Sequence, residues 1–195
     1  MYQSHQLIKE LRAIDTKKIT QKKLIELHIK AENNGVKDGI DEYHSELFRG
    51  YSTIRGYQLR IKKISPYPYG TPILGVLFIM YFFDDEELAR KEASIICSHP
   101  QTLLACNALI TLMKTKSLDD VKEIIKDDKQ LLAVCNDAID LKKTNYYFLP
   151  LWCRHYFLFA MAGYFSLPLP YGIQHPHILY LIYCIVHDTF HRPQS

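Results

Sequence analysis

The last twenty residues of the sequence hold the side chains most suited to binding a metal. Cys184, His187 and His191 follow one another at spacings of three and four, which places them on one face of a helix. A thiolate and two imidazoles are ligands that Zn²⁺ prefers, and His175 or His177 could complete a tetrahedral set. The spacing matches no standard zinc module, and no glutamate follows His187 as in an HExxH motif. The pattern is therefore compatible with a zinc-stabilised helical module, but capping or surface histidines explain it more simply.

Other groups that could support catalysis are less specific. The dipeptide His187-Asp188 resembles the metal dyad of HD-type phosphohydrolases, but the other ligands of that site cannot be assigned in this chain. Three acidic pairs stand where helices are predicted to begin, so capping explains them without a two-metal site. These pairs are Asp84-Asp85, Asp119-Asp120 and Asp127-Asp128. Because no GxSxG, P-loop or GxGxxG motif is present, we assign no catalytic residue and no obligatory cofactor, and favour a non-enzymatic protein.

Residues 146–169 are strongly aromatic and contain the only tryptophan of the chain. Arg154 and His155 interrupt this run, and a charge in the middle of a bilayer is costly, so a membrane span is not expected. A buried helix or an exposed aromatic surface fits better, and large exposed apolar patches mark interfaces. The side chains expected to contact a protein partner or a second copy are Trp152, Tyr156, Phe157 and Tyr164.

The elements that must position these groups are clearest in the middle of the chain. Thr71 is a suitable N-cap and Pro72 a suitable first helical residue. Residues 73–83 are apolar on every side except at Gly75, which predicts a helix covered on all sides. This run is much shorter than the roughly 20 residues that a membrane helix needs.

Further helices follow on both sides of this run. Acidic residues 84–87 favour the start of a second helix, and Ser98 with Pro100 favours the start of a third. Ser117 begins a possible capping box. Pro176 is predicted to start a final helix that ends near His191.

Composition favours a single all-α domain of nine or ten helices. The chain has 195 residues, 48% of them hydrophobic, enough for one substantial core. We divide it into N-terminal helices at 1–64, core helices at 70–142 and aromatic helices at 146–195. The net charge of +3 is too small to indicate a nucleic-acid partner. Five cysteines without CxxC spacing and a polar start predict reduced thiols and a cytoplasmic location.

The central stretch resembles part of the ADP-ribosylglycohydrolase family. The likeness rests on Gly70-Thr71, the apolar helix that contains Pro72, the acidic cap after it, Ser98-His99-Pro100, and Ala105-Cys106. The resemblance implies a helical fold and an ADP-ribose pocket near Gly70, Thr71 and His99. The family's magnesium motifs, of the Thr-Asp-Asp-Thr and Gly-x-Asp-x-Asp types, are absent. A relative of that family would therefore be a degenerate one, and no catalytic residue is carried over.

Three functions are compatible with these patterns. The first is a non-catalytic helical protein that binds a protein partner, or itself, through its aromatic C-terminal region. The second is an ADP-ribose-binding protein or ADP-ribosyl-hydrolase-type enzyme that uses magnesium. The third is a helical module stabilised by zinc at its C-terminal histidines.

Overall fold

The computed structural model describes residues 8, 9, 11–13, 22, 25, 26, 28, 29, 71–138, 153–167 and 176–193. These residues contain seven helices and no strand, which confirms the all-α prediction. The sequence predicts nine or ten helices for the whole chain, and most of residues 1–64 lies outside the described part. The helices are α5 (Thr71–Phe83), α6 (Glu86–Ile96), α7 (Pro100–Thr115), α8 (Leu118–Ile125), α9 (Lys129–Asp137), α10 (Cys153–Tyr164) and α11 (Pro176–His191).

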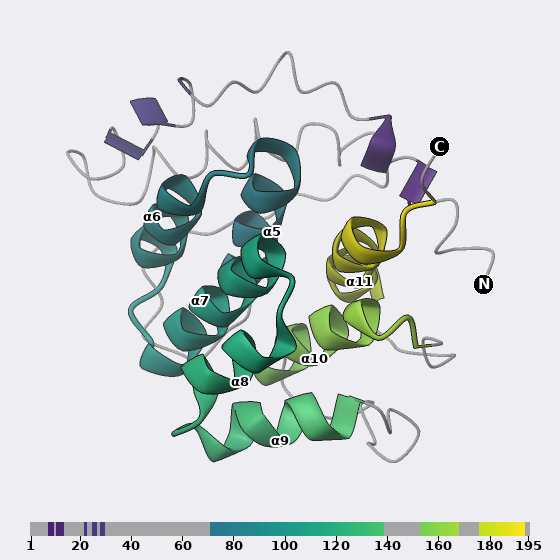
Figure 1. Cartoon of the computed structure of the whole chain (residues 1–195). Coiled ribbons are helices and arrows are strands. Elements are labelled where there is room, and N and C mark those ends of the chain that lie inside the picture. Colours follow the sequence, from purple (N-terminus) through teal and green to yellow (C-terminus); the bar gives the residue numbers. More distant parts are fainter. Residues whose placement is uncertain are drawn as a thin grey trace.

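Helix α5 lies in the middle of this arrangement and packs against α6, α7, α10 and α11 (Figure 1). Its side chains from Ile73 to Met80 are buried, which confirms that this apolar run is a core helix. The predicted cap was wrong by one residue, because the helix begins at Thr71 and includes it. Within the described residues, no helix is long and apolar enough to cross a membrane.

Acidic or hydroxyl side chains cap three of the helices that follow α5, namely α6, α8 and α9. Asp85 accepts a hydrogen bond from the Leu88 amide at 2.9 Å, and so begins α6. Ser117 and Asp128 cap α8 and α9 in the same way. These bonds satisfy amides that lack a partner inside the helix. Capping thus accounts for Asp85 and Asp128, whereas Asp119 and Asp120 lie in the first turn of α8, where the helix dipole favours negative charge.

The start of α7 corrects one prediction. His99, and not Ser98, is the N-cap residue of this helix, and its side chain makes no capping bond. The His99 amide instead donates to the sulfur of Cys97 at 3.3 Å. This local contact closes the turn between α6 and α7, with Pro100 in the first helical position as expected.

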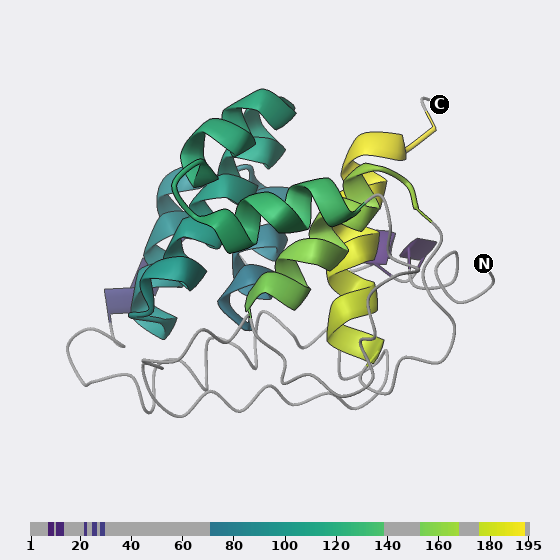
Figure 2. The same ribbon diagram turned by 90° about the horizontal axis from the view of Figure 1, so that it is seen from below.

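Helices α10 and α11 form the most extensive pair and lie side by side (Figure 2). Gly163 makes their close approach possible, because a Cβ there would lie 2.5 Å from the backbone oxygen of Tyr183. A contact that short is excluded for any larger residue without moving a helix. The boundaries of α11, Pro176 and His191, agree with the sequence prediction.

All five cysteines of the sequence are buried, and none forms a disulfide, as the prediction of reduced thiols required. Burial raises the pKa of Cys153 to about 11 and that of Cys184 to about 12. Neutral thiols at physiological pH act as small apolar side chains and not as nucleophiles.

Candidate functional site at the end of helix α11

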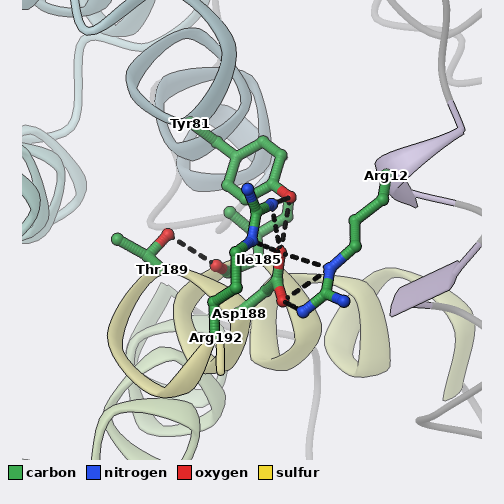
Figure 3. A network of polar contacts seen from close by, with 6 residues as sticks. All are labelled: Arg12, Tyr81, Ile185, Asp188, Thr189 and Arg192. Carbon is green, nitrogen blue, oxygen red and sulfur yellow. Dashed lines mark hydrogen bonds and ion pairs between the residues drawn. The ribbon is translucent and has the colours of Figure 1, made fainter. Parts of the chain in front are cut away.

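The buried carboxylate of Asp188, near the end of α11, accepts hydrogen bonds from two arginines and a tyrosine (Figure 3). Arg12 donates to Asp188 through Nε at 3.0 Å and also through Nη2. Arg192 donates to the same carboxylate through Nη2 at 2.6 Å and Nε at 3.2 Å. The hydroxyl of Tyr81 donates to Oδ2 of Asp188 at 2.6 Å. We call these four residues the Asp188 cluster.

Three separate parts of the chain supply this cluster. Asp188 and Arg192 are four residues apart on α11 and therefore share one helix face. Tyr81 comes from the last turn of α5, which packs on α11. Arg12 lies 176 positions from Asp188 in the sequence, so the cluster fastens the N-terminal segment to the last helix.

The electrostatics of the cluster leave a surplus of positive charge. Burial alone would raise the pKa of Asp188, but hydrogen bonds from Arg12, Arg192 and Tyr81 outweigh it and lower the pKa to about 2. Burial and the hydrogen bond to Asp188 raise the pKa of Tyr81, which therefore stays neutral. Two guanidinium groups thus face one carboxylate, and the cluster carries a formal charge of +1 at neutral pH.

The predicted zinc ligands Cys184, His187 and His191 share α11, but their side chains have other contacts. Nε2 of His187 lies 3.1 Å from the Ser166 hydroxyl, and Nε2 of His191 donates to the Tyr164 carbonyl oxygen at 2.7 Å. Cys184 is fully buried. No group of three or more potential ligands that could hold a metal occurs among the described residues. His175 lies outside them, so the zinc site stays a prediction.

The predicted partner-binding aromatics divide into buried and exposed members. Tyr156 and Phe157 belong to α10 and are buried in the core, and this corrects their expected place on an open surface. The cause is that α10 is enclosed by neighbouring helices, including α11 and α9. Trp152 lies outside the described residues. Tyr164, at the end of α10, is partly exposed, as the prediction requires of a docking residue.

Tyr164 belongs to a partly exposed group that the sequence did not single out. Its ring packs edge to face against Phe165 and Phe190, with centroids 5.0 and 4.9 Å apart. The ammonium group of Lys116, just after α7, lies 4.8 Å from the centre of the Phe190 ring, a cation–π contact. We call Tyr164, Phe165, Phe190 and Lys116 the aromatic cluster.

A second buried acid lies in α6. Glu92 is fully buried and accepts a hydrogen bond from Nε2 of His28 at 2.9 Å. A Cβ at position 75 would lie 2.6 Å from Oε1 of Glu92, so Gly75 leaves the space that this carboxylate occupies. A glycine within an apolar core helix is one sequence signal of such a close contact.

The predicted ADP-ribose pocket is only partly within the described residues. Gly70 and the side chain of Thr71 lie outside them. His99 is half-buried at the start of α7, and its Nδ1 atom has no hydrogen-bond partner among the described residues. A ligand site near these residues therefore stays a prediction.

Sequence reasoning missed the partners of both buried acids. The sequence prediction paired Asp188 only with its neighbour His187, whereas its contacts are Arg12, Tyr81 and Arg192. The spacing of Asp188 and Arg192 was a usable signal, because opposite charges four residues apart on a helix attract each other. Arg12 gave no comparable signal, since nothing local relates it to α11.

Comparison with known proteins adds no further assignment. No protein-family model, curated protein or solved structure matches this chain.

Proposed function

We propose that this chain is a non-catalytic helical protein that binds a protein partner through its aromatic cluster. The observation that carries the proposal is the grouping of Tyr164, Phe165 and Phe190, whose rings contact one another and remain partly exposed. Aromatic side chains supply a large contact area at a small entropic cost, and they are enriched at interfaces.

The rings of the cluster pack against the core and keep part of their surface exposed near the ends of two helices. Tyr164 is the last residue of α10, Phe165 follows it directly, and Phe190 lies in the last turn of α11. Figure 2 shows the end of α11 beside the segment that leaves α10, at one side of the molecule. The hydrogen bond from His191 to the Tyr164 carbonyl oxygen joins the two helix ends. The rings therefore stand on a fixed support, which reduces the ordering cost of binding.

The charges around the aromatic cluster indicate which side chains a partner would carry. Burial lowers the pKa of Lys116, and this ammonium group makes no ion pair within 4 Å among the described residues. The Asp188 cluster, joined to the aromatic cluster through α11, adds a surplus positive charge. A segment with apolar side chains next to acidic ones would complement both features. A second copy of this chain would present like charges instead.

Peptide selection tests this proposal without knowledge of the natural partner. A random peptide library is displayed on phage and selected against the full chain, and the dissociation constant of each enriched peptide is measured by fluorescence anisotropy. We expect enriched peptides to combine aromatic or aliphatic residues with aspartate or glutamate. Phe190→Glu and Lys116→Glu should each weaken binding at least tenfold, which corresponds to about 1.4 kcal/mol.

Lys129→Glu is the control, because Lys129 is exposed at the start of α9 and its substitution changes the charge by as much as Lys116→Glu does. It should leave the dissociation constant unchanged, and circular dichroism should confirm that each variant folds. Peptides that bind Phe190→Glu as tightly as the wild type would contradict the proposal. If sedimentation shows that the wild type is a dimer and Phe190→Glu is a monomer, the partner is a second copy of this chain and not a different protein.

A further inference from the structure

The N-terminal part of the chain is attached to the helices at two described places, and the two attachments differ in kind. Arg12 binds Asp188 near the end of α11, and His28 binds Glu92 in α6. In Figure 1 the described N-terminal pieces lie near α11 at one side and near α6 at the other. We call the described residues 8, 9 and 11–13 the N-terminal turn.

The N-terminal turn is amphipathic. The Ala13 amide donates to the Lys9 carbonyl oxygen at 3.2 Å, which is the spacing of a helical turn. Leu11 is fully buried in the core, and Ile8 is partly buried against it, whereas Lys9 and Ala13 are exposed. The described contacts that hold the turn are therefore two apolar side chains and the guanidinium group of Arg12.

Asp188 keeps other partners when Arg12 is absent. Arg192 donates to the same carboxylate through Nε and Nη2, and the Tyr81 hydroxyl donates to Oδ2. Figure 3 shows that Arg12 reaches the carboxylate from the side opposite to Arg192. Because Arg192 and Tyr81 belong to α11 and α5, they remain in place when the N-terminal turn leaves. Its departure therefore creates no unpaired buried charge, which is the costly outcome of breaking such a pair.

The attachment at His28 is enclosed on both sides. The side chains of His28 and Glu92 are at most 3% exposed, whereas that of Arg12 is 41% exposed. Releasing His28 removes a hydrogen-bond donor from a fully buried carboxylate, and breaking a buried pair costs far more than breaking an exposed one. The chain should therefore stay attached at His28 under conditions that release Arg12.

We infer that the N-terminal turn is a releasable strap, which detaches from α11 while His28 stays on Glu92 and the helices remain folded. In the closed form Leu11 completes the core, and in the open form the apolar surface beneath Leu11 becomes accessible. Segments held by few buried contacts open locally at a lower free energy than the whole fold. This inference goes beyond the proposed function, because opening requires neither the aromatic cluster nor a partner.

Native-state proteolysis of the full chain measures this opening. Thermolysin cleaves before large apolar residues, and cleavage before Leu11 requires this buried side chain to leave the core. Mass spectrometry identifies each product, and each cleavage rate is divided by that of a free peptide of the same sequence. This normalised rate follows the population of the open form when reclosing is faster than cleavage. We expect it to be at least about tenfold higher before Leu11 than before Leu109, which is buried in α7 and requires global unfolding.

Substitutions of the two arginines should act in opposite directions. Arg12→Gln removes the polar contact of the strap, so the normalised rate before Leu11 should rise about fivefold. In Arg192→Gln, opening leaves Asp188 with only the Tyr81 hydroxyl among its described partners, so the rate should fall about fivefold. Lys9→Gln is the matched control, because it removes one positive charge from an exposed side chain of the same turn and should leave the rate unchanged.

Circular dichroism should confirm that each variant folds. If Arg192→Gln does not fold, Arg192→Lys should still lower the rate by a smaller factor, because lysine keeps the charge but lacks the planar donor edge of arginine. Equal normalised rates before Leu11 and Leu109 in the wild type would overturn the inference. A rate in the folded Arg192 variant that does not fall below the wild-type rate would overturn it as well.

Discussion

Two carboxylates, Glu92 and Asp188, are buried among the described residues, and their environments differ. Glu92 meets His28 inside the protein, where both side chains are at most 3% exposed. Asp188 is equally buried, but its two arginines extend to the surface. In Figure 1 the described N-terminal pieces lie near α6 at one side and near α11 at the other. Glu92 and its partner therefore both lie inside the protein, whereas the arginines bound to Asp188 are exposed to solvent.

The difference separates a structural role from a candidate functional role. A buried pair contributes through the cost of breaking it, and its surroundings exclude any ligand. The Asp188 cluster keeps its carboxylate buried, whereas its two arginines remain accessible to solvent. The two acids thus allow a direct comparison of how much an enclosed ion pair and a solvent-exposed one each contribute to stability.

The largest expected effect comes from the interior acid. Glu92→Ala removes the acceptor of a buried histidine and leaves a cavity beside Gly75. We expect the free energy of unfolding, measured in urea, to fall by about 3–5 kcal/mol. Glu92→Gln keeps the volume and an acceptor oxygen, so it should lose clearly less. A loss below about 1 kcal/mol for Glu92→Ala would remove the contrast between the two acids.

Either arginine of the Asp188 cluster should be able to pair with the carboxylate when the other is removed. Arg12→Gln and Arg192→Gln should each lower the free energy of unfolding by about 1 kcal/mol or less, because the exposed partner is lost while the other still pairs with Asp188. The double variant leaves the buried carboxylate with only Tyr81 and should lose about 3 kcal/mol. Chemical denaturation of all four proteins measures this non-additivity. Strictly additive losses would show that the two arginines act independently.

The acid dependence of stability should be smaller than the loss expected for the double arginine variant. The pKa of Asp188 is about 2 in the folded protein, below its ordinary value of 3.8. The folded state thus binds fewer protons than the unfolded state, and stability falls as the pH drops from about 5 through 2. The loss should be about 2 kcal/mol, and Asp188→Asn should lack this component. Denaturation at several pH values checks it, and parallel curves for both proteins would contradict it.

Local sequence patterns predicted much of the fold but little of the candidate site. The apolar run at 73–83 and the limits Pro176 and His191 of the last helix follow from periodicity and proline placement. Such signals act over a few residues and therefore define helices well. They also suggested that Tyr156 and Phe157 were open to a partner, because an aromatic helix has the same pattern whether it is exposed or enclosed.

The contacts that form the site depend on how distant helices pack. Arg12 meets Asp188 across 176 positions, and His28 meets Glu92 across 64. No periodicity within one helix contains this information. Glu92 did carry a weak signal, because it falls within the apolar stripe that includes Leu88 and Ala93 on α6. A charged residue on an inward face requires a buried partner, although the sequence does not say which one.

The dissociation constant of a selected acidic peptide for Phe190→Glu, compared with Lys129→Glu, tests the central claim most directly. If the ends of α10 and α11 form the binding surface, the first variant weakens binding at least tenfold, and the second leaves it unchanged. Equal dissociation constants for the two folded variants would place the binding surface elsewhere on the molecule.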